Sequence, residues 1–104
     1  MKWISFCLGV FYTSHLFAAD VAALGGKVLS DGSSTVFPIS EAVGEEFQKA
    51  NPKVKVAIAV SGTGGGFKKL CKGEIDLSGA SRPIEASEIE ACKANKVEFV
   101  ELPI

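Results

Sequence analysis

Segments with strand-like and helix-like patterns alternate along residues 27–102, and this alternation limits the fold more than any other feature of the sequence. Alternating β-branched residues predict a strand over 53–60, and shorter strands are predicted over 27–30, 75–78 and 97–102. Apolar residues at helical spacing predict helices between them, over 38–50, 67–72 and 87–95. Strands that alternate with helices usually form a parallel sheet with helices packed against it, so the sequence predicts an α/β fold.

Local signals place the ends of these helices. Pro38 suits a first helical turn, and the Asn-Pro pair at 51–52 stops the first helix. Gly73 is predicted to end the second helix, and Ser87 with Glu90 has the spacing of a capping box that begins the third. The first helix is predicted to be amphipathic, with apolar positions at Ile39, Ala42, Val43, Phe47 and Ala50.

Three loops lead from a predicted strand into the next helix, at residues 31–37, 61–66 and 79–83. In a parallel sheet such loops share the edge at the carboxyl ends of the strands, where ligands bind. Helix N-termini at this edge present unpaired N–H groups, and the Arg82 guanidinium can make bidentate contacts to an oxyanion. The sequence therefore predicts a site for phosphate, sulfate or a similar anion. Its hydroxyl donors are Ser33, Ser34, Thr35, Ser61, Thr63 and Ser81.

Each of these loops also has a simpler interpretation. Each loop alone is compatible with an ordinary turn, and Arg82 has Glu85 as an alternative surface partner. The start of a dinucleotide fingerprint at 62–64 lacks its later glycine, because Phe67 stands there. A nucleotide P-loop also fails, since Lys68 is followed by lysine rather than Ser or Thr.

The composition argues against an enzyme and against a nucleic-acid partner. The only histidine, His15, lies in a segment that we expect to be removed, so no remaining hydroxyl has a histidine base. The carboxylates show no metal-ligand clustering, and we expect neither a metal nor a cofactor. A net charge of -1 does not provide the basic stripe typical of nucleic-acid binding.

The N-terminal residues have the order of a secretory signal peptide. Lys2 precedes an apolar run over 3–17, and small residues follow it. Cleavage is predicted after Ala23, with Ala19 as the second choice, leaving residues 24–104. The alternatives are a retained membrane anchor or a buried helix, but the run is shorter than the ~20 residues that a spanning helix needs.

Export changes the interpretation of the cysteines. Cys7 would leave with the signal, and Cys71 and Cys92 would remain on apolar helix positions. An even pair in an oxidising compartment predicts a disulfide. Two buried free thiols are the alternative.

Three segments, 31–38, 61–69 and 73–83, together resemble the start of phosphate-binding proteins of ABC-type phosphate transporters. The resemblance implies a type II periplasmic-binding-protein-like fold, of which this chain would be part of the first lobe. Ser81 stands where many members have an aspartate, so the choice among oxyanions stays open. By the resemblance, phosphate contacts come from the Thr35 hydroxyl, the Val36 N–H with Ser34 adjacent, Thr63, Ser81 and Arg82.

The resemblance also implies a biological role. Inorganic phosphate would be bound in the periplasm and delivered to an ABC permease at the inner membrane. Cys71 and Cys92 would be bonded, as expected in a branch of that family. Members are several hundred residues long, so we expect the chain to be a truncated or split product. The alternative is a remnant, or an anion-sensing or interaction module, without a transport function.

Overall fold

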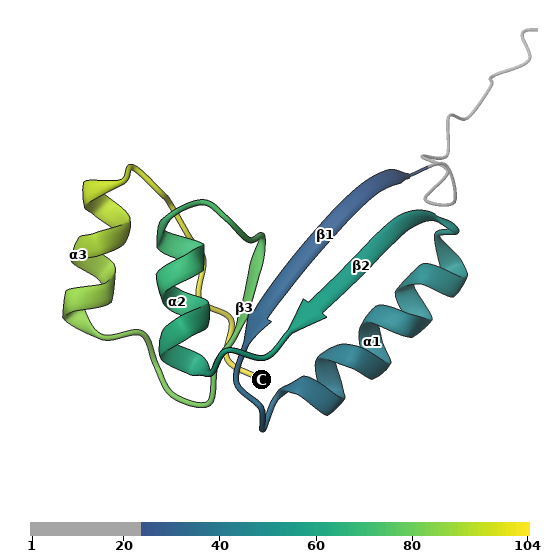
Figure 1. The fold of residues 1–104 in the computed structure, drawn as a ribbon, viewed down its shortest axis with the longest axis horizontal. Coiled ribbons are helices and arrows are strands. Elements are labelled where there is room, and N and C mark those ends of the chain that lie inside the picture. The colour runs from purple at the N-terminus through teal and green to yellow at the C-terminus, as the bar shows by residue number, and fades with distance from the viewer. Residues whose placement is uncertain (1–23) are drawn as a thin grey trace, which may run out of the picture.

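A computed structural model describes residues 24–104. The predicted signal segment, 1–23, lies outside the described residues, so cleavage after Ala23 stays a prediction. Residues 24–104 form three strands and three helices in alternation (Figure 1). Their bounds are β1 (Gly25–Gly32), α1 (Phe37–Ala50), β2 (Lys53–Ala59), α2 (Thr63–Cys71), β3 (Leu77–Gly79) and α3 (Ala86–Ala94).

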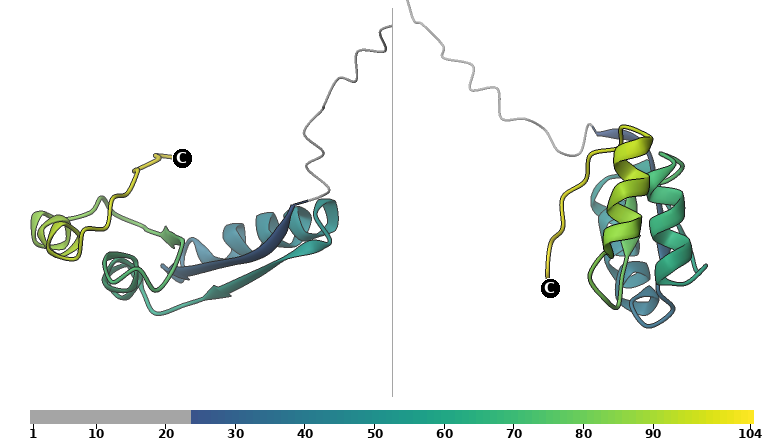
Figure 2. Two further views of the ribbon diagram at one scale, coloured as in Figure 1. Left: turned by 90° about the horizontal axis from the view of Figure 1, so that it is seen from above. Right: turned by 90° about the vertical axis from the view of Figure 1, so that its left-hand side faces the viewer.

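The strands form one parallel sheet in the order β2-β1-β3, which confirms the predicted α/β class. Gly25 of β1 pairs with Lys53 of β2 and Asp31 with Ala59, while Ser30 pairs with Leu77 of β3. α1 packs on β2, α2 packs on β1 and β3, and α3 packs on the outer side of α2 (Figures 1 and 2). The strand-to-helix loops therefore meet at the carboxyl ends of the strands.

The glycine loop is shorter than predicted, because α2 begins at Thr63 rather than near residue 67. Gly62 precedes the helix with a φ of 87°, and the Gly66 N–H donates the first helical hydrogen bond to its carbonyl at 2.9 Å. Glycine at position 66 also lets α2 approach the sheet. A Cβ there would lie 2.5 Å from Ser78 Oγ and 2.8 Å from Gly32 Cα.

Gly73 ends α2 as predicted. It has a φ of 72°, and its N–H donates to the Leu70 carbonyl at 2.9 Å. The Glu74 N–H reaches the Lys69 carbonyl at 3.0 Å, which completes a Schellman motif.

α1 is a helix, but the predicted apolar face does not pack on the sheet. Gly44 is its buried residue, and a Cβ there would lie 3.1 Å from both Val56 Cγ1 and Ile58 Cδ1. One turn later, Gln48 Oε1 accepts the Val56 N–H at 2.8 Å. The predicted apolar positions are exposed instead: Ile39 by 58%, Val43 by 63% and Phe47 by 40%.

Two predictions about the C-terminal third are wrong. No strand forms over 97–102 within the described residues, because this segment makes no ladder with β2 or β3, and Val100 is 82% exposed. α3 begins at Ala86, and its capping box is formed by Glu85 and Glu88 rather than by Ser87 and Glu90. Glu88 Oε2 accepts the Glu85 N–H at 2.8 Å, which favours the earlier start.

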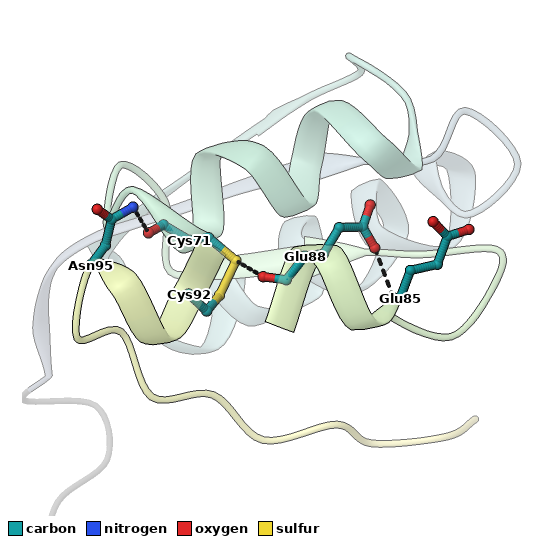
Figure 3. The surroundings of a disulfide bond; sticks show 5 residues. All are labelled: Cys71, Glu85, Glu88, Cys92 and Asn95. Carbon is teal, nitrogen blue, oxygen red and sulfur yellow. Dashed lines mark hydrogen bonds between the residues drawn. A yellow bond between two sulfur atoms is a disulfide. The ribbon is translucent and has the colours of Figure 1, made fainter. Parts of the chain in front are cut away.

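A disulfide joins Cys71 of α2 to Cys92 of α3, as predicted, with the two Cα atoms 4.2 Å apart (Figure 3). Both cysteines are almost fully buried, at 2% and 0% exposure. Asn95 Nδ2 donates to the Cys71 carbonyl at 2.9 Å, and Cys71 Sγ lies 3.3 Å from the Glu88 carbonyl oxygen. Within residues 24–104 the buried hydrophobic side chains are Val54, Phe67, Cys71 and Cys92, so the two cysteines make up half of this core.

None of the helices described in residues 24–104 has the length and apolar character required to cross a membrane.

Candidate functional site

Backbone hydrogen bonds bring the three predicted loops together at the carboxyl edge of the sheet. The Ser33 N–H of the first loop donates to the Gly79 carbonyl at 2.8 Å. The Gly62 N–H of the second donates to the Gly32 carbonyl at 2.9 Å. The close approach requires glycine at position 32, whose φ is 151°, because a Cβ there would lie 2.0 Å from Gly79 O.

The second and third loops also meet through predicted ligand residues. Thr63 Oγ1 lies 3.1 Å from Ser81 Oγ, and the Ser81 N–H donates to Thr63 Oγ1 at 3.2 Å. Thr63 is the first residue of α2, and the N–H groups of a first helical turn have no partners within the helix. Their partial positive charge makes this a suitable place for an anion.

The first loop carries Ser34, Thr35 and Val36. Ser34 and Thr35 are exposed, and the Thr35 N–H donates to Ser33 Oγ at 3.1 Å. Val36 caps α1, and its Cγ1 lies 3.3 Å from where a Cβ on Gly79 would be, so this loop packs against the third. The structure thus brings the loop of Thr35 to the same edge as Thr63 and Ser81.

Arg82 is already engaged, mainly by Glu88. Its two terminal nitrogens donate to the two Glu88 carboxylate oxygens at 3.0 and 2.8 Å, and one of them also donates to the Pro83 carbonyl at 3.0 Å. The expected alternative partner, Glu85, is more distant at 3.7 Å. The guanidinium carbon lies 5.3 Å from the centre of the Phe67 ring. Of its five N–H donors, two are left for a ligand.

The pairing of Arg82 with Glu88 shifts the pKa values of both groups. The hydrogen bond from Arg82 lowers the pKa of Glu88, against the effect of burial. The hydrogen bond to Glu88 raises the pKa of Arg82. Both groups are therefore held in their charged forms at neutral pH.

Asp31 was predicted only as a turn residue, but it is a buried charge at the centre of the edge. Its side chain is in contact with Lys69 of α2 through Oδ2, while Oδ1 accepts hydrogen bonds from Ser61 and Gly32. The hydrogen bond from Lys69, together with those from Ser61 and Gly32, lowers its pKa from 3.8 to about 2, although burial opposes this. The signal in the sequence is its position, because it is a carboxylate directly after the predicted strand 27–30, at the edge where the loops meet.

The donors at this edge are suited to holding an oxyanion by hydrogen bonds. Hydroxyl groups, the first turn of α2 and the remaining Arg82 N–H groups are all donors. Asp31, the carboxylate at the end of β1, already has its own donors. Residues 24–104 contain no cluster of three or more His, Cys, Asp or Glu side chains that could hold a metal ion.

Comparisons with known proteins identify the family of this chain. Residues 18–104 match the family model described as the PBP superfamily domain. The chain is 56% identical to Protein SphX of Synechococcus elongatus over 85 residues, which are 82% of this chain and 25% of that protein.

Solved structures show the same similarity. The crystal structure of a possible phosphate binding protein from Planctomyces limnophilus matches with a TM-score of 0.73 and 55% identity, over 75% of this chain and 28% of that one. An ABC-type phosphate transport receptor from Vibrio cholerae matches with a TM-score of 0.59 and 28% identity, over 61% of this chain and 25% of that one. The chain thus spans about a quarter of the length of these relatives.

Proposed function

Because the chain belongs to the PBP superfamily, we propose that its loop edge binds inorganic phosphate. The observation that carries the proposal is the contact between Thr63 and Ser81 beside the N-terminus of α2. Two hydroxyls and unpaired backbone N–H groups are the donors that a tetrahedral oxyanion requires. The names of two similar solved structures, a possible phosphate binding protein and a phosphate transport receptor, support phosphate among the oxyanions.

The proposed ligand set keeps every predicted residue. Thr35, Thr63 and Ser81 would contribute hydroxyls, and Val36 its backbone N–H. Arg82 would contact the anion through its two remaining N–H groups while Glu88 holds the other side of the guanidinium. Ser34 lies beside this set in the first loop.

The proposed role is that of a solute-binding protein rather than an enzyme. In this proposal residues 1–23 are a signal peptide, residues 24–104 are the N-terminal part of the binding domain, and the location is the periplasm. The proposed partner is an ABC permease, and the name of a similar solved structure, an ABC-type phosphate transport receptor, supports this part of the proposal. The similar structures are about four times as long as the matched region, so this chain would contribute one side of a larger phosphate site.

The test is a phosphate titration of the purified, oxidised chain followed by two-dimensional ¹⁵N NMR, which detects millimolar affinities residue by residue. The amide signals of Val36, Thr63 and Ser81 are expected to shift together with one dissociation constant. Thr63→Val keeps the side-chain shape but removes the hydroxyl, which should weaken binding by roughly 1–3 kcal/mol. Ser87→Ala, which removes a hydroxyl from α3, is the matched control and should bind as the wild type does.

Sulfate serves as the competing anion in the same titration. Stronger binding of phosphate supports the named ligand, whereas equal binding would retain the site and reject phosphate selectivity. The site would be rejected if phosphate caused no amide shifts at the loop edge, or if Thr63→Val left the dissociation constant unchanged.

A further inference from the structure

We propose that Asp31 is the positioning residue of the loop edge: its carboxylate holds the chain entering α2 against the end of β1, and thereby places Thr63 for the anion. This inference rests on the phosphate-binding function proposed above. Asp31 would not contact the anion itself. It would act through Ser61 and Gly62.

The contacts of Asp31 are unusually complete for one side chain. Oδ1 accepts the Gly32 N–H at 2.7 Å, the Ser61 N–H at 2.8 Å and the Ser61 hydroxyl at 2.7 Å. Oδ2 forms an ion pair with Lys69. The carboxylate is only 1% exposed, so water does not compete for these donors. It therefore connects the end of β1 to the chain before α2 and to the body of α2.

These contacts determine the position of Thr63. Both residues before it are attached to β1, because Ser61 is bound by the Asp31 carboxylate and the Gly62 N–H donates to the Gly32 carbonyl. Thr63 follows directly and meets Ser81 of the third loop. A shift of the Ser61 backbone would therefore move the Thr63 hydroxyl and the first N–H groups of α2 together.

Lys69 compensates the negative charge of the Asp31 carboxylate. A buried carboxylate close to an anion site would repel the anion, and the ion pair with Lys69 offsets this charge. The half-buried lysine is thus engaged by Asp31 and is not proposed as a phosphate ligand. Replacing it should weaken binding indirectly, by leaving the Asp31 charge without its partner.

Backbone packing supports α2 independently of Asp31, so the two roles can be separated. Gly66 lies so close to β1 that a Cβ on it would be 2.9 Å from the Asp31 carbonyl oxygen. Loss of the carboxylate should therefore loosen residues 61–63 without releasing the whole helix. A residue with a purely structural role would instead affect global stability and binding in parallel.

The test compares Asp31→Asn with Asp76→Asn in the full, oxidised chain. Asp76 is the control because its Oδ2 also accepts a β1 amide, from Leu29 at 2.8 Å, but it is exposed and lies just before β3 rather than at the loops. Amide hydrogen exchange and inorganic phosphate titration are measured by ¹⁵N NMR. Asp31→Asn should speed exchange at Ser61 and Gly62 at least tenfold and weaken phosphate at least tenfold. Asp76→Asn should change neither.

A second pair of variants keeps the test informative if Asp31→Asn fails to fold. Lys69→Met should weaken phosphate several-fold, and Lys69→Arg, which keeps the cation, should restore it. Wild-type exchange at Ser61 and Gly62 in Asp31→Asn would overturn the inference. Equal losses in Asp31→Asn and Asp76→Asn, or in Lys69→Met and Lys69→Arg, would also overturn it.

The two proposals fail in distinguishable ways. If the wild type does not bind phosphate, the proposed function is rejected, and hydrogen exchange alone then decides the role of Asp31. Faster exchange confined to residues 61–63 in Asp31→Asn would support a positioning role for the loop. Unchanged exchange would reject that role even if phosphate binds.

Discussion

Removal of the Cys71–Cys92 disulfide should destabilise the domain by about 3 kcal/mol, according to the chain-entropy model. The cysteines are 21 positions apart, so the bond closes a loop of 22 residues counting both. Without it, the unfolded chain gains freedom that this loop otherwise restricts. A stability change of this size is large, because a domain of this length is usually stable by only about 4–12 kcal/mol.

The contacts of α3 indicate which part of the protein should open first when the disulfide is removed. Cys92 is the only buried residue of α3, so little apolar packing remains to hold the helix when the bond is absent. The other attachments are polar: the pair between Arg82 and Glu88, and the hydrogen bond from Asn95 to the Cys71 carbonyl. We therefore expect α3 to lose amide protection before the β1–β2 pair does.

The assay is urea denaturation followed by circular dichroism on the oxidised wild type and on the double variant Cys71→Ala/Cys92→Ala. Reduced wild type is the control, since it keeps both sulfur atoms in the sequence but removes the cross-link. The double variant and the reduced wild type should both unfold at a lower urea concentration than the oxidised wild type. If reduced and oxidised protein differed by less than about 1 kcal/mol, the chain-entropy argument would be wrong for this domain.

Asp31 has a folded pKa of about 2 against 3.8, so the stabilisation that its carboxylate gives to residues 61–63 should be present above pH 4 and lost as the pH falls towards 2. Protection of the Ser61 and Gly62 amides from hydrogen exchange should decline over this range in the wild type and decline less in Asp31→Asn. Gly66→Ala should cost roughly 1–3 kcal/mol by overpacking, whereas Gly64→Ala, with Arg82 3.8 Å away, should be tolerated in the same thermal melts. Glu88→Gln should loosen Arg82, seen as faster exchange of its guanidinium N–H signals, and identical exchange would contradict the observed pairing.

Local patterns were sufficient for several parts of this protein. The order of strands and helices up to α3 followed from periodicity, and the end of α2 followed from Gly73. The shared edge of the three loops followed from topology, because every parallel strand that feeds a helix does so at the same side of the sheet. The pairing of Cys71 with Cys92 was also predicted, since only two cysteines remain after the proposed signal.

Other features depended on neighbours that are distant in the sequence. The side of α1 that contacts the sheet was set by how closely Gly44 could approach β2, and hydrophobic spacing pointed to another face. The segment at 97–102 has a strand-like sequence but forms no ladder, because a strand exists only through hydrogen bonds to a partner.

For the charged residues of the site, the sequence again predicted position along the chain but not the partners. The sequence by itself placed Arg82 and the hydroxyl residues in loops at one edge, because loop position follows from the order of elements. Only the tertiary structure decided that Glu88 holds Arg82 and that Asp31 is buried against Lys69, 38 positions away. Ion pairs of this kind arise from side chains that folding brings together, and their spacing in the sequence carries no period from which they could be predicted.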